Sequence, residues 1–183
     1  MADGDTGKSM EEKFADYAAK VAARGTFPVW DDAPTQLVKD DDLPWAEAPD
    51  GSAIKLLHVD LNQGLWVSLT RLPPGHKVIK HFHTGFVYAV TLQGKWFYEE
   101  TPEAVSESGS YLFEPAGSTH TLCTPDDVEG DTIVWFAIYG ANINLDEAGN
   151  VVSVVDARAA LEMYRVYCDA VGFDCSKLIV QGE

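Results

Sequence analysis

The chain is poor in basic residues and has no long apolar run. Its 183 residues include 13 Lys and Arg against 29 Asp and Glu, a formal net charge of −16. Such an acidic chain repels nucleic acid and anionic membrane surfaces. No apolar run is long enough to span a bilayer, and the N-terminus lacks the basic and apolar regions of a signal peptide. We therefore expect a soluble, cytoplasmic protein with a small partner and neither a nucleic acid nor a membrane partner.

Cysteine is also scarce. Cys123, Cys168 and Cys175 are odd in number and widely separated, which fits a reducing compartment better than a disulfide framework. Cys123 lies three residues after His120, where a thiolate could approach a metal. The alternative is that Cys123 is a small apolar filler, the common role of a free cysteine.

Short runs of β-branched and aromatic residues fill the middle of the chain. Turn residues separate them, and no stretch of helical spacing lies between them. This pattern predicts an antiparallel sandwich or barrel. The expected strands are 54–59, 65–72, 86–92, 95–100, 111–113, 119–123 and 132–139.

Helical spacing appears on both sides of these strands. Apolar residues at three- and four-residue steps predict an amphipathic helix over 10–23, closed by Gly25, and a second helix over 155–171 that covers a barrel face. The acidic, turn-rich segment after the first helix should wrap around the barrel. We expect a single domain made of a helix and wrapping segment (1–52), a barrel (53–145), and a turn with a covering helix (146–183).

Three histidines form the candidate metal site. His81 and His83 stand two residues apart, so in a strand they project from one face and can bind the same ion. His120 can return from a later strand to complete the site. Three imidazoles with at most one carboxylate suit iron(II), zinc, copper, nickel or cobalt rather than magnesium or calcium. Such a site leaves coordination positions for substrate and oxygen.

The spacing around these histidines is more specific than the histidines themselves. It resembles the two sequence motifs of the cupin superfamily, small β-barrels that hold a metal at their mouth. The motifs read Gly75-x5-His81-x-His83 and Gly109-x5-Pro115-x-Gly117-x2-His120. The resemblance implies an all-β cupin barrel (a double-stranded β-helix or jelly roll) with N-terminal and C-terminal helices. The alternative is a cupin barrel that has lost its metal.

One position departs from the cupin pattern. A glutamate usually follows the second histidine by four residues as a fourth ligand, but Val87 stands there. A two-residue hairpin at 93–94 would place Glu100 directly opposite Val87, on the same sheet face. We therefore predict Glu100 as the fourth ligand, directly or through water, with a solvated strand-end glutamate as the alternative. Glu99 would face the other side, and Glu114 has the wrong parity in its own strand.

The same hairpin register aims Trp96 and Tyr98 into the barrel beside the metal. A cavity lined by aromatic residues around one charged centre suits a planar organic substrate. Trp96 and Tyr98 are therefore the candidate substrate-pocket residues, and the alternative is that both belong to the core. Tyr98 is also a candidate catalytic residue, because its hydroxyl could hydrogen-bond a substrate oxygen.

A narrower resemblance is carried by residues 92–100, 109–120 and 144–152 with the helix that follows. These segments are similar to the 2,4'-dihydroxyacetophenone dioxygenase family of cupins, over most of 56–172. The Gly-x-Trp-x-Tyr-x-Glu element of this family also places a glutamate at Glu100.

This resemblance implies a non-haem iron(II) enzyme. It would use O2 to cleave the carbon–carbon bond between an aryl ketone carbonyl and its hydroxymethyl carbon, giving two carboxylic acids. The implied iron ligands are His81, His83 and His120, with Glu100 as a labile or water-bridged fourth. Tyr98 would hydrogen-bond the substrate, and Trp96 would stack on its ring.

Two other classes share the same histidines. One is a zinc-dependent isomerase or hydrolase, and the other is a metal-binding sensor domain whose partner-binding element would be the helix at 10–23. The partners expected for the dioxygenase are a small aromatic ketone and O2. Since cupin barrels commonly dimerise, we expect a homodimer or a higher homo-oligomer.

Overall fold

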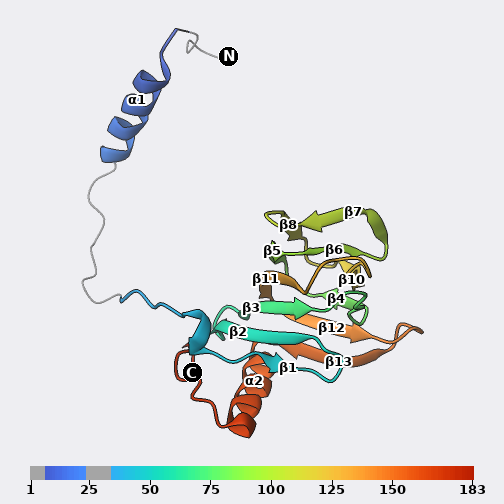
Figure 1. The fold of residues 1–183 in the computed structure, drawn as a ribbon. Helices are drawn as coiled ribbons and strands as arrows, with labels where there is room; N and C mark the ends of the chain where they lie inside the picture. Colours follow the sequence, from blue (N-terminus) through green and yellow to red (C-terminus); the bar gives the residue numbers. More distant parts are fainter. Residues whose placement is uncertain (1–6, 24–33) are drawn as a thin grey trace. The chain divides into compact units, whose positions relative to one another are not determined.

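A computed structural model describes residues 7–23 and 34–183 (Figure 1). The chain divides into two units, residues 1–35 and 36–183. Helix α1 (Met10–Ala22) belongs to the first unit, and all the described strands and helix α2 (Ala157–Val171) belong to the second. Within the described ranges, neither helix has the length and apolar character needed to cross a membrane.

Helix α1 confirms the first predicted helix. A capping box begins it, because the Ser9 hydroxyl accepts from the Glu12 backbone N–H while the Glu12 carboxylate accepts from the Ser9 N–H. Its large apolar side chains Met10, Phe14 and Tyr17 are all exposed. Gly25, expected to close this helix, lies outside the described residues.

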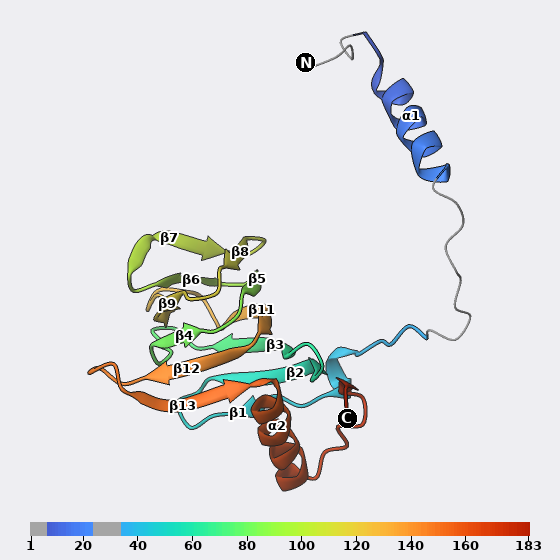
Figure 2. The ribbon, with the colours of Figure 1, turned by 180° about the vertical axis from the view of Figure 1, so that it is seen from behind.

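The strands of the second unit form three sheets (Figures 1 and 2). The largest has the order β1-β2-β3-β11-β5-β8, with β14 beside β2, and a four-stranded sheet has the order β13-β12-β4-β9. A three-stranded sheet has the order β10-β6-β7. The strands are β1 (Ala46–Glu47), β2 (Ala53–Asp60), β3 (Leu65–Leu72), β4 (His81–His83), β5 (Val87–Gln93), β6 (Lys95–Tyr98), β7 (Thr101–Glu107), β8 (Tyr111–Glu114), β9 (Thr119–His120), β10 (Leu122–Cys123), β11 (Thr132–Tyr139), β12 (Ala141–Leu145), β13 (Val151–Asp156) and β14 (Ile179–Gln181).

The predicted all-β class is confirmed, but the predicted hairpin register is wrong. Among the described strands, β5 pairs with β11 and β8, whereas β6 pairs with β7 and β10. Gly94 has φ +74°, and a Cβ there would come within 2.5 Å of Thr132 Oγ1. The same Oγ1 accepts from Lys95 N and donates to Lys95 O. The turn is therefore held against β11, and β6 continues into another sheet.

The described core lies between the sheets and under α2. Trp96 is fully buried, and its indole N–H donates to Thr91 Oγ1 at 2.8 Å. Part of the predicted wrapping segment packs here too, since Leu43 is buried and Pro44 O accepts from Tyr164 Oη. A short 3-10 helix (Asp40–Asp42) precedes these two residues. The domain limits at 52 and 145 stay a prediction.

Helix α2 confirms the second predicted helix and packs against β2 and β13 (Figure 2). Asp156 caps its N-terminus by accepting from Ala159 N, and Gly172 ends it in the left-handed conformation. The chain then turns back, so Cys175 forms a disulfide with Cys168 in the last turn of α2. The sequence, interpreted as fitting a reducing compartment better than a disulfide framework, did not indicate this bond, because the turn at Gly172 brings the two cysteines together.

Candidate metal centre

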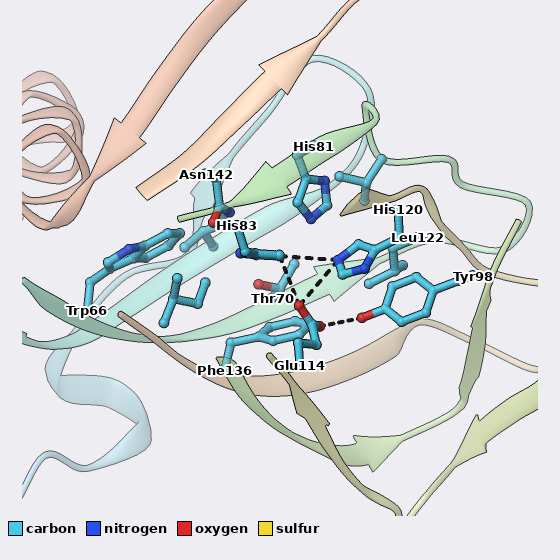
Figure 3. Close-up of a pocket in the computed structure, with 13 residues that line it drawn as sticks. Trp66, Thr70, His81, His83, Tyr98, Glu114, His120, Leu122, Phe136 and Asn142 are labelled. Atoms are coloured by element: carbon cyan, nitrogen blue, oxygen red, sulfur yellow. Dashed lines mark hydrogen bonds and ion pairs between the residues drawn. The ribbon is translucent and has the colours of Figure 1, made fainter. Parts of the chain in front are cut away.

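Strands β4 and β9 place three imidazoles on one wall of a cavity (Figure 3). His81 and His83 alternate with the less buried Phe82, as the two-residue period of a strand requires. His120 lies directly opposite His81 across the antiparallel pair. All three histidines are buried, and their candidate ligand atoms lie within 4.8 Å of one another. The structure thus brings together the three predicted histidines.

A carboxylate also reaches this cluster, and it belongs to Glu114. Its Oε2 lies 2.9 Å from His83 Nε2 and 3.2 Å from His120 Nε2. The Glu114 side chain is 4% exposed, whereas Tyr111 and Phe113 of the same strand face outward. The parity assigned to Glu114 from the sequence is therefore wrong. The two outward rings pack against Tyr88 on the outer surface, with centroid distances of 6.4 and 5.7 Å.

Glu100 lies elsewhere. Its carboxylate accepts from the backbone N–H and the hydroxyl of Thr121, and Lys80 Nζ lies 3.8 Å away. Burial alone would raise the pKa of Glu100, but the bonds from Thr121 and the charge of Lys80 outweigh it and lower the pKa. With 37% of its side chain exposed, Glu100 resembles the solvated strand-end glutamate of the alternative interpretation. The structure does not bring Glu100 to the histidine cluster, because the hairpin that would have done so does not form.

The spacing of the donor atoms fits a bound metal ion. His83 Nε2 and His120 Nε2 are 3.2 Å apart, and Glu114 Oε2 lies 2.9 Å from the first and 3.2 Å from the second. Ligands about 2.1 Å from one ion lie about 3.0 Å apart when adjacent in an octahedron and about 3.4 Å apart in a tetrahedron. Apart from these two imidazoles, the buried Glu114 Oε2 has no hydrogen-bond partner. Two imidazole nitrogens and a carboxylate oxygen at these separations are placed as ligands of one cation would be.

The protonation of His81 also suits a ligand. Its Nδ1 lies 2.8 Å from the carbonyl oxygen of Ile79, and since a carbonyl can only accept, Nδ1 carries the proton. The lone pair is then on Nε2. Burial, together with the neighbouring histidines, lowers the pKa of His81 to about 4, against the opposing bond to Ile79. The ring is therefore neutral at physiological pH.

Tyr98 connects two members of the cluster. Its ring stacks on His120 with centroids 3.9 Å apart and planes 17° apart, and its hydroxyl donates to Glu114 Oε1. Burial and then the charge of Glu114 raise the pKa of Tyr98, so its proton stays on Oη. Burial opposes ionisation of Glu114 as well, but His120 and His83 outweigh it and hold the pKa of that carboxyl well below its usual range. The pair is therefore a phenol that donates to a carboxylate.

The cavity beside the cluster has a volume of about 550 Å³, its open mouth included. Tyr98 lines it as predicted, but Trp96 does not, because its ring lies in the core. Cys123 lies outside the histidine cluster, and burial raises the pKa of its thiol, which favours the filler interpretation. The lining residues are Ile54, Trp66, Thr70, Val78, His81, His83, Tyr98, Glu114, His120, Leu122, Phe136, Ile138 and Asn142.

The sequence interpretation set Glu114 aside because of its parity, and it did not identify Trp66 or Asn142. The position of Glu114 next to Pro115 of the second motif was the one available signal for it. Trp66 and Asn142 lie outside both motifs, on strands that only the sheet topology places beside the histidines. Nothing in their spacing could have identified them.

Comparison with solved structures supports the fold. A cupin-like protein of unknown function from Ralstonia eutropha JMP134 is 30% identical, covers 85% of this chain and 97% of its own, and has a TM-score of 0.76. An RmlC-like cupin from the same organism is 29% identical, with coverages of 80% and 94% and a TM-score of 0.74. An acetylacetone dioxygenase from Acinetobacter johnsonii shares the fold at 18% identity, with coverages of 78% and 99% and a TM-score of 0.65.

No curated protein matches the chain. A family model, described as the ChrR cupin-like domain, matches residues 33–141, which is more than half of the chain. This match includes all three histidines and Glu114. The chain therefore belongs to the ChrR cupin-like domain family, within the cupin superfamily.

Proposed function

We propose that the protein is a non-haem iron(II) dioxygenase that acts on an aryl α-hydroxyketone of the 2,4'-dihydroxyacetophenone type. The observation that carries this proposal is the three-histidine, one-carboxylate cluster on the wall of a cavity whose other lining residues are largely apolar. A substrate in that cavity would reach the same ion as the protein ligands. The likeness of residues 92–100 and 109–120 to the 2,4'-dihydroxyacetophenone dioxygenases supports this choice of substrate.

The metal ligands in this proposal are His81, His83, His120 and Glu114, with Glu114 replacing the Glu100 expected from the sequence. When bound, iron(II) supplies Lewis acidity toward the two oxygens of a hydroxyketone and electron transfer with O2. Zinc would supply only the Lewis acidity, which is why the choice of metal separates the candidate functions.

The protein's own residues orient the metal ligands and line the site. The bond from His81 Nδ1 to Ile79 O fixes the direction of the Nε2 lone pair. Tyr98 Oη keeps its proton and donates a hydrogen bond to Glu114 Oε1, which holds the carboxylate toward the histidines. Leu122 and Phe136, both buried, give the cavity wall an apolar surface, and low local polarity strengthens each of these interactions.

The proposed reaction balances without another reactant. The bond between the carbonyl carbon and the hydroxymethyl carbon breaks, and each carbon takes one oxygen atom from O2. The two carbons together lose the four electrons that reduce O2. The products are an aryl carboxylic acid and formic acid.

Oxygen uptake tests this proposal. The protein would be loaded anaerobically with iron(II) or with zinc, mixed with 2,4'-dihydroxyacetophenone, and then exposed to O2. We expect uptake of one O2 and release of one formate per ketone with iron, and none with zinc. His83→Ala removes one ligand of the cluster and should lose both metal and uptake. Two results together would contradict the proposal. They are tight binding of zinc, and no oxygen uptake by the iron-loaded protein with any hydroxyketone.

A metal-binding sensor is the second candidate function. It is favoured by α1, which forms part of a separate unit and exposes Met10, Phe14 and Tyr17, as a partner-binding helix would. A sensor should bind its metal without consuming O2 in the assay above. The homo-oligomer expected from the sequence stays a prediction, which the molar mass from light scattering would test.

A further inference from the structure

Three buried polar atoms without hydrogen-bond partners belong to one end of the cavity. They are Nε1 of Trp66, Nδ1 of His83 and Oδ1 of Asn142. All three residues line the cavity, and Figure 3 shows Trp66 and Asn142 beside His83, away from Tyr98. Buried polar groups without partners are uncommon in folded proteins, so three at one place require an explanation.

The sheet places two of these residues side by side. Asn142 of β12 is the direct register partner of His83 of β4. The Nε2 atom of His83 faces Glu114 and His120, so Nδ1 lies on the far edge of the ring, toward Asn142 (Figure 3). A histidine that binds a metal through Nε2 carries its proton on Nδ1 and needs an acceptor for it. The same strand pair therefore presents a donor and an acceptor.

Trp66 adds a second donor. Its side chain is on β3, and the residue is 6% exposed. An indole N–H can only donate. The end of the cavity near His83 thus combines two N–H donors with one amide oxygen.

We propose that Trp66, His83 and Asn142 form a polar subsite that binds a hydroxyl group carried on the substrate's ring. This subsite is separate from the place where the two oxygens of the hydroxyketone would reach the metal. The identity of its substrate rests on the proposed function. A hydroxyl oxygen accepts from the N–H groups while its own hydrogen donates to Asn142 Oδ1. A ketone or ether oxygen would leave Oδ1 unpaired, and an apolar ring edge would leave all three atoms unpaired.

Binding of a matched ligand pair tests the subsite. The metal-loaded protein would be titrated by calorimetry without O2, with 4'-hydroxyacetophenone and with acetophenone, which differ only in the ring hydroxyl. We expect the hydroxylated ligand to bind at least about tenfold more tightly. Asn142→Leu and Trp66→Phe should each reduce that ratio to about threefold or less, mainly by weakening the hydroxylated ligand.

Trp45→Phe is the matched control, because the Trp45 ring packs on Lys55 and Arg71 outside the cavity. It should keep the tenfold ratio. The titration needs no turnover, so the two proposals can fail separately. If the hydroxylated ligand binds more tightly but the iron-loaded protein takes up no O2 with a hydroxyketone, the proposed function is rejected and the subsite is kept. Equal affinities of the unchanged protein for the two ligands would overturn the subsite, and so would a tenfold affinity ratio that persists in both Asn142→Leu and Trp66→Phe. Either result would indicate a structural water at these atoms instead.

Discussion

Val87 and Glu114 lie directly opposite each other on β5 and β8. Val87 is fully buried at the position where the first cupin motif usually has its glutamate, and Glu114 places its carboxylate between His83 and His120. The idea that the residue paired with Val87 supplies the missing carboxylate is therefore consistent with the structure. The partner strand is β8, however, and not β6.

Exchanging Glu114 for Gln tests this relationship. Glu114→Gln keeps the size of the side chain but removes the charge beside the two imidazoles, so metal affinity should fall at least about tenfold. Glu100→Gln, whose carboxylate contacts Thr121 and Lys80, should change it less than about twofold. Competition with a chelating dye measures both. A larger loss for Glu100→Gln would restore Glu100 as the ligand.

Removing the hydroxyl of Tyr98 should separate catalysis from metal binding. Tyr98→Phe keeps the ring that stacks on His120 but loses the donor to Glu114 Oε1. We expect unchanged metal stoichiometry and a turnover number reduced at least about tenfold, because the carboxylate loses its orientation. Tyr111→Phe, at an exposed ring, is the control. Full turnover of Tyr98→Phe would show that the hydroxyl has no part in the reaction.

Reducing the Cys168–Cys175 disulfide should destabilise the C-terminal segment. The bond joins residues seven apart, and closing a loop of that size contributes about 2 kcal/mol to the free energy of unfolding. Urea unfolding with and without a reductant measures this loss. Cys175→Ser should reproduce this loss and no longer respond to the reductant, whereas Cys123→Ser, at a free thiol, should keep both the stability and the response of the unchanged protein. An unfolding midpoint of the unchanged protein that does not respond to the reductant would contradict the prediction.

The stability of the metal-free protein should fall below neutral pH. Burial lowers the pKa of His81 to about 4 in the folded chain, and the unfolded value is about 6.5. Between these values the unfolded state binds more protons, so the free energy of unfolding decreases as the pH falls. The loss should be on the order of 3 kcal/mol from pH 6.5 to 4. Urea titrations would measure it, and His81→Gln should reduce the pH dependence; an unchanged dependence would reject this origin.

Local patterns in the sequence determined most of what was predicted correctly. The two-residue period of a strand puts His81 and His83 on one face whatever the partner strands are. The three- and four-residue apolar spacing identified both helices, and the alternation of short apolar runs with turns identified the β class. These features depend on neighbours along the chain, so the amino-acid order contains them.

The tertiary structure alone decided the features that depend on which strands meet. Glu100 and Glu114 have similar local surroundings in the sequence, but the turn at Gly94 packs against Thr132, β6 lies in a different sheet from β5, and β8 pairs with Val87. Trp66 and Asn142 likewise reach the cavity only through the register of β3 and β12. Sheet pairing joins residues far apart in the chain, and a change of partner strand alters which side chains meet at the site.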